Sequence, residues 1–138
     1  MKRNPALAIG MLATLAAASL WHWPGGAANR FTATAERTMR ITLDHYEMPG
    51  VAVRLQRDPL TRTLRFDGSA DDFQRSEILR IGREVPGVAD TAWAGRPGPR
   101  ALPLLAEVML MALACFAIGA VLAYIAALRR RAEEAIYA

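Results

Sequence analysis

The sequence has few of the residues that form covalent cross-links or metal sites. Its single cysteine, Cys115, has no partner in the chain, which excludes an intrachain disulfide. The two histidines, His22 and His45, have no further histidine or cysteine at ligand spacing, so no metal site is predicted. No G-x-S-x-G motif and no glycine-rich phosphate loop occurs, and no cofactor is expected. We therefore predict a protein that is not an enzyme.

The middle of the chain lacks an excess of charge of either sign. Residues 31–95 contain nine Arg and ten Asp plus Glu, although the whole chain has a formal net charge of +4. The excess lies at the chain ends, in Lys2, Arg3 and the three arginines at residues 129–131. Binding of nucleic acid needs a clustered basic surface, so it is not predicted.

Charged residues are also missing from residues 108–128. As a helix rising 1.5 Å per residue, this run would extend about 31 Å, which matches the hydrocarbon core of a bilayer. We predict a transmembrane helix over residues 103–128. Pro103 suits its first turn, where a missing N–H removes no hydrogen bond.

A second uncharged run, residues 6–21, follows the basic N-terminus. A basic start, a moderate apolar run and small residues after it are typical of a secretory signal peptide. The length of the run and the tryptophans Trp21 and Trp23 are typical of an uncleaved anchor. The anchor is favoured for residues 1–23, and both interpretations remain open. In either case the segment that follows is exported.

Basic residues beside both apolar runs predict how the chain crosses the membrane. The positive-inside rule places Lys2, Arg3 and residues 129–131 in the cytoplasm. The C-terminal tail, residues 129–138, is then cytoplasmic and the middle of the chain lies outside. In a bacterium, this describes an inner-membrane protein with a periplasmic central domain.

Small residues recur at a four-residue step in both apolar runs. Such a ridge lets two helix backbones approach closely in lipid, where packing drives association. An alanine-rich sequence also produces this spacing by chance. The ridges could otherwise pair with each other or with the helix of a partner. The candidate packing residues are Gly10, Thr14, Ala18, Cys115, Gly119 and Ala123.

Two Gly/Pro-rich segments, residues 24–30 and 96–102, read as linkers around a domain of residues 31–95. Within the domain, apolar residues first recur at a helical period (Ala35, Met39, Leu43), then alternate (Val51, Val53, Leu55), and later return to a helical period. The predicted elements are a helix over residues 31–46, strands over 51–56 and 63–67, a helix over 69–85 and a strand over 88–93. The fold class is α+β in the order αββαβ. Gly82 inside a helix predicts a close approach of that helix to the sheet.

The run LRFDGSADDFQRSEILRIGREVPGVADTAW resembles the BON domain, a small αββαβ module of the bacterial envelope. The shared features are an extended segment ending in glycine, a helix with small and aliphatic residues on its inner face, and Gly-Val opening the last strand. The matching positions are Leu64, Phe66, Gly68, Arg75, Ile78, Ile81, Gly82, Val85, Gly87 and Val88.

The resemblance covers about residues 33–93 and has two departures. Thr91 stands where the family has an aliphatic residue, and the hairpin loop around Pro59 is longer than is usual. BON domains are regarded as modules that bind lipid or protein. The resemblance therefore implies a binding role in the envelope, with no ligand named.

Four arginines, Arg54, Arg57, Arg62 and Arg65, occupy positions of the hairpin that could share one side. A solvated face balanced by nearby acids is one interpretation. Contact with anionic phospholipid or an acidic partner is the other, at about 1 kcal/mol per basic residue near an anionic surface. We predict a non-enzymatic membrane protein that presents a binding module to phospholipid or envelope proteins. The alternative is an accessory subunit whose helices pack into a larger membrane complex.

Overall fold

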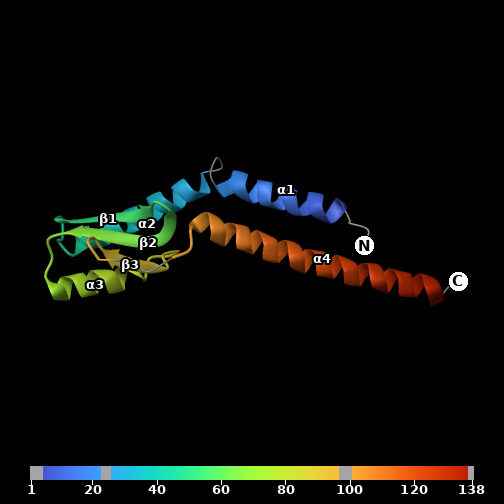
Figure 1. The fold of residues 1–138 in the computed structure, drawn as a ribbon. Helices are drawn as coiled ribbons and strands as arrows, with labels where there is room; N and C mark the ends of the chain where they lie inside the picture. The colour runs from blue at the N-terminus through green and yellow to red at the C-terminus, as the bar shows by residue number, and fades with distance from the viewer. Residues whose placement is uncertain (1–4, 23–25, 97–100, 137–138) are drawn as a thin grey trace.

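The structure, a computed structural model, describes residues 5–22, 26–96 and 101–136. Figure 1 shows two long helices with a small mixed domain at one end of the pair. The long helices are α1 (Pro5–His22) and α4 (Leu104–Ile136). The domain consists of α2 (Ala27–His45), β1 (Val51–Arg57), β2 (Leu60–Gly68), α3 (Asp72–Gly82) and β3 (Asp90–Trp93). The predicted α+β class is therefore confirmed.

Helices α1 and α4 are both long and apolar enough to cross a membrane. They pack against each other, and the first turn of α1 and the last turn of α4 lie at the end of the pair away from the domain (Figure 1). Helix α4 has 33 residues, so it extends about 50 Å and continues through the arginines of the predicted tail. Lys2 and Arg3, on which the predicted orientation partly depends, lie outside the described residues. So do Trp23 of the predicted anchor and residues 24–25 and 97–100 of the predicted linkers.

The sheet has the order β1-β2-β3. Strands β1 and β2 form an antiparallel hairpin, and β3 runs parallel to β2 after the crossover helix α3. The resemblance to the BON pattern suggested a long hairpin loop around Pro59. The loop is short instead, because only Asp58 and Pro59 separate the two strands. The extra residues are instead in β2, where residues 61–63 face the single residue Gln56 as a bulge.

Helices α2 and α3 cover one face of the sheet, and the core lies between them. Helix α2 contributes a stripe of Ala35, Met39 and Leu43 at the predicted helical spacing, all buried. At the centre of the sheet, Phe66 is fully buried and stacks on Trp93 with 6.3 Å between ring centroids. The domain is thus a two-layer structure with a single small core.

Helix α3 lies close to the sheet where Gly82 faces Phe66 and Thr91. A Cβ added to Gly82 would lie 2.9 Å from both Phe66 and Thr91, as the position of Gly82 in a helix predicts. Thr91 is buried, and its hydroxyl donates to the carbonyl of Leu79 at 2.8 Å. The hydroxyl thereby has a partner at a position where the family pattern has an aliphatic residue.

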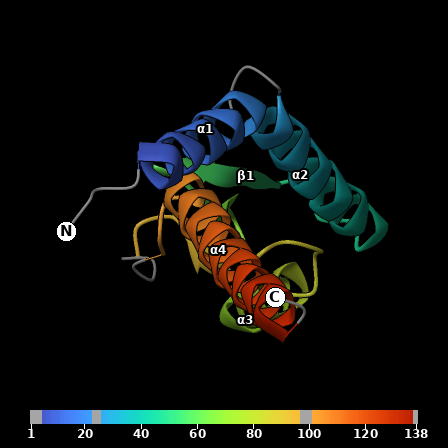
Figure 2. The same ribbon diagram turned by 90° about the vertical axis from the view of Figure 1, so that its right-hand side faces the viewer.

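Several element boundaries differ from the sequence predictions. Helix α2 begins at Ala27, inside the predicted linker, after Gly26 in a left-handed conformation with φ of 72°. Helix α3 begins after Asp71, which forms a capping box with Gln74, and ends at Gly82 instead of residue 85. It ends early because Pro86 disfavours helical geometry in the residue before it. The last strand begins at Asp90, two residues later than predicted. Figure 2 shows α1 and α2 lying at an angle to each other.

Candidate functional site

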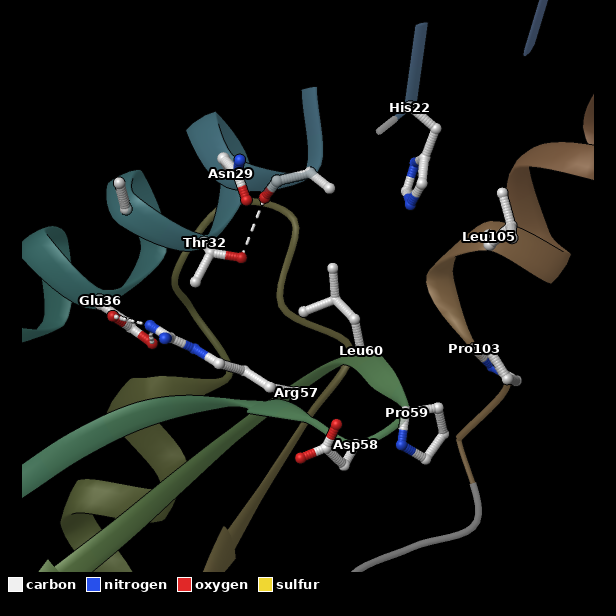
Figure 3. A pocket seen from close by; sticks show the side chains of 12 residues that line it. His22, Asn29, Thr32, Glu36, Arg57, Asp58, Pro59, Leu60, Pro103 and Leu105 are labelled. Atoms are coloured by element: carbon white, nitrogen blue, oxygen red, sulfur yellow. Dashed lines mark hydrogen bonds and ion pairs between the residues drawn. The ribbon is translucent and has the colours of Figure 1, made fainter. Parts of the chain in front are cut away.

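A pocket of about 640 Å³ lies where the domain meets the two long helices (Figure 3). We call it the junction pocket. The last residue of α1, one side of α2, the turn between β1 and β2, and the start of α4 form its walls. The walls are mostly apolar and the pocket is partly open. Its volume is within the range of about 300–1,000 Å³ that is typical of small-molecule sites.

His22 ends α1 and is one polar group of this pocket. Its side chain is only 6% exposed, and the ring points into the pocket between Leu60 and Leu105 (Figure 3). In the part of the chain that the structure describes, no residue forms a hydrogen bond with the ring. An imidazole that forms no hydrogen bond with the described residues can offer its ring nitrogens to a bound molecule.

Glu36 and Arg57 form one wall of the pocket. The Nη2 atom of Arg57 lies 3.2 Å from each carboxylate oxygen of Glu36, and Oε1 of Glu36 also accepts the N–H of Leu55 at 2.8 Å. Arg40 likewise donates to the carbonyl of Val51 at 2.8 Å. Side chains of α2 therefore satisfy groups along the outer edge of β1, which reduces the exposure of that edge to strand pairing.

Asp58 lies in the hairpin turn at the rim of the pocket. Its side chain is exposed, and it has no hydrogen bond or ion pair with any described residue. Two carboxylates and one guanidinium thus line the pocket, and the guanidinium is already paired with Glu36. Among these carboxylates and the guanidinium, one negative charge is in excess.

Arg62 joins the domain to α4. Its Nε atom lies 2.7 Å from Oε2 of Glu107, which is in the first turn of α4. The two side chains form an ion pair, but the Nε–H bond is not directed at this oxygen and makes no hydrogen bond. The pair is partly buried, so water screens it less than it would a surface pair. It helps to hold β2 against the start of α4.

The four predicted contact arginines do not form one basic surface. Arg57 forms an ion pair with Glu36 of α2, and Arg62 forms one with Glu107 of α4. Arg54 and Arg65 are directly opposite each other across β1 and β2, on the sheet face away from α2 and α3. Arg65 donates to the side chain of Gln56 at 3.1 Å. Arg54 and Arg65 therefore lie together on one face of the hairpin, whereas Arg57 and Arg62 each point to an acidic side chain of another element.

The predicted packing residues behave differently on the two long helices. Gly10, Thr14 and Ala18 are half-buried on α1, and a Cβ at Gly10 would lie 3.2 Å from Phe116 of α4. Cys115, Gly119 and Ala123 are exposed, and no atom would lie within 4 Å of a Cβ at Gly119. The half-buried ridge of α4 is instead Ala112, Phe116 and Ala120.

A second hollow, of about 270 Å³, lies between α2 and α3. Tyr46 and Phe73 line it and are largely exposed, with Phe73 at 76%. Arg80 lies at its rim. The hydrogen bonds that its guanidinium donates to Glu77, together with the charge of that carboxylate, raise the pKa of Arg80. Exposed aromatic residues of this kind are common where proteins meet.

Comparison with protein-family models, with curated proteins and with solved structures finds no match for the chain. Among residues 5–22, 26–96 and 101–136, no group of three or more His, Cys, Asp or Glu side chains could hold a metal ion. The junction pocket offers apolar walls, a free carboxylate, a paired guanidinium and an imidazole. This combination suits the binding of an amphiphilic molecule.

Proposed function

We propose that the chain is a non-enzymatic inner-membrane protein that presents a BON-like module at the periplasmic face for contact with phospholipid or envelope proteins. In this proposal α1 and α4 cross the membrane, and both chain ends are cytoplasmic. The junction pocket carries the proposal, because the domain and the ends of both apolar helices build it together.

The position of the pocket supports a role at the membrane surface. His22 is the last residue of α1, and Leu105 belongs to the first turn of α4. If both helices span a bilayer, these residues lie near the level of the lipid head groups, where apolar and polar groups meet. An apolar pocket that opens at this level is accessible to lipid and to proteins close to the membrane.

A photoreactive amino acid tests this function. Ala33 lines the pocket, and the next residue, Thr34, is exposed outside it. With benzoyl-phenylalanine at position 33 of the full chain in native membranes, we expect a lipid or protein adduct that mass spectrometry detects. The same residue at position 34 is the matched control and should give a background level. Equal labelling at both positions would contradict a binding role for the pocket.

The exposed ridge of α4 favours a second candidate function, an accessory subunit that packs into a larger membrane complex. Gly119 has no neighbour from α1, whereas Gly10 is in contact with Phe116. We expect Gly119→Leu to remove a partner that co-purifies with the chain in mild detergent, because a large side chain would hold a second helix away. Gly10→Leu should instead disturb the packing of α1 on α4. Retention of every partner by the Gly119→Leu variant would exclude this candidate.

A further inference from the structure

We infer that the chain associates with a second copy of itself through the hollow between α2 and α3, which we call the helix groove. In this contact Phe73 of each copy enters the helix groove of the other. The inference goes beyond the proposed function, because the groove shares no residue with the junction pocket. It rests only on that part of the proposal in which α1 and α4 cross the membrane.

Phe73 is unusually exposed for a side chain of its size. Its exposed fraction of 76% is the highest of any large apolar side chain that the structure describes, those of α1 and α4 included. In a membrane, lipid would cover the apolar side chains of the long helices, but Phe73 belongs to the domain. Tyr46, which also lines the groove, is 54% exposed. Two exposed aromatic side chains beside one hollow are typical of a surface that another protein covers.

The helix groove provides a place for such a side chain. Met39, Leu43 and Ile78 line it and are at most 3% exposed, so its base is the apolar core itself. The space above them is about 270 Å³. This is below the range of about 300–1,000 Å³ that is typical of small-molecule sites. The groove therefore suits an inserted side chain, as in the central pockets of protein interfaces.

One surface thus carries both a protruding aromatic side chain and a hollow. A contact between two different proteins needs only one of these features on each partner. A two-fold contact between identical chains needs both features on the same surface, because each copy gives and receives the same group. The combination of Phe73 and the groove meets this requirement, which favours a second copy over an unrelated protein.

The charges beside the groove are also compatible with a second copy. The guanidinium of Arg80 lies 2.9 Å from a carboxylate oxygen of Glu77 and 2.9 Å from one of Glu84. Each acid is about one helical turn from Arg80, so in a contact at equal height the guanidinium of one copy lies near the acids of the other. A surface with charges of only one sign would repel its own copy. This surface carries both signs.

The direction of the groove permits the contact within one membrane. Helices α2 and α3 cover one face of the sheet, and α3 runs roughly along the direction of α4 (Figure 1). The groove therefore opens to the side of the molecule. Two chains that cross the same bilayer hold their domains at equal height, and a two-fold axis along the membrane normal brings their grooves together. Because the bilayer raises the effective concentration, a contact smaller than the usual area of about 1,200 Å² suffices.

The test uses two versions of the full chain with different tags, produced together in native membranes. With benzoyl-phenylalanine at position 73 of one version, we expect an adduct that carries both tags and has twice the mass of the chain. The matched control is the same amino acid at position 76, because Ser76 is exposed on α3 but does not line the groove. It should give a background level.

A substitution measures the contribution of Phe73. After solubilisation in a copolymer that retains lipid, Phe73→Ala in both versions should lower co-isolation of the second tag about ten-fold, as for a central aromatic side chain of an interface. Ile41→Ala is the control, because Ile41 is 60% exposed on α2 and does not line the groove. It should leave co-isolation unchanged. Circular dichroism of the two variants should be the same, which separates lost association from unfolding.

The possible failures are distinguishable. Equal co-isolation of the Phe73→Ala and Ile41→Ala variants would overturn the inference. So would an adduct at position 73 with another protein and none with the second copy. Release of the chain from membranes by alkaline carbonate would instead overturn the proposed function, whatever the result of co-isolation.

Discussion

Phe66→Ala should unfold the domain while leaving α4 helical. Phe66 has no exposed surface, stacks on Trp93, and would contact any side chain added at Gly82. Truncation of a buried phenylalanine to alanine costs about 3–5 kcal/mol. A single core in a domain of this size rarely provides more than about 3–5 kcal/mol of stability. The loss is therefore comparable with the whole free energy of unfolding.

Hydrogen exchange on the full chain measures this effect. In the Phe66→Ala variant, amides of β1, β2 and β3 should lose protection, whereas amides of α4 should keep it. Phe73→Ala is the matched control, because the same truncation occurs at a side chain that is 76% exposed. Its effect should stay within about 0.5 kcal/mol. Equal protection in the two variants would show that Phe66 is not at the centre of the core.

Much of the domain could be predicted because local patterns determine it. The helical spacing of Ala35, Met39 and Leu43 identified the buried side of α2, and the alternation of Val51, Val53 and Leu55 identified the inner face of β1. The boundaries were less accurate where a boundary depends on a tertiary contact. The bulge in β2 is an example, because residues 61–63 join the strand only when they are opposite Gln56.

The junction pocket could not be predicted, since it is built from segments far apart in the sequence. His22, the hairpin turn and Leu105 meet only after the chain has folded. The ion pairs could not be predicted either, because their partners are also far apart in the sequence. Arg57 is 21 residues from Glu36, and nothing in the sequence indicates that a helix would place that carboxylate beside β1. On α4, the ridge that faces α1 is one residue away from the predicted one, because alanines occur at both sets of positions.

Gly68→Ala should cost about 2–6 kcal/mol, from backbone strain of about 1–3 kcal/mol and steric overlap of similar size. Gly68 has a φ of 131°, a region that residues with a side chain rarely adopt. An added Cβ would also collide with the carbonyl oxygen of Gly50 in the neighbouring chain segment. Because that obstacle is backbone, a side-chain rotation cannot relieve the overlap. The end of β2 would have to separate from β1, where Gly68 is paired with Val51.

Gly50→Ala is the matched control, because it adds the same methyl group beside the same strand pair. No atom would lie within 4 Å of the new Cβ, and Gly50 does not have a positive φ. Alanine at such a position restricts the unfolded chain and should stabilise the domain by about 0.4–1 kcal/mol. Urea unfolding of the full chain should therefore shift to lower concentration for Gly68→Ala and slightly to higher concentration for Gly50→Ala. Shifts of equal sign and size would mean that the left-handed geometry of Gly68 and its contact with Gly50 do not hold the hairpin together.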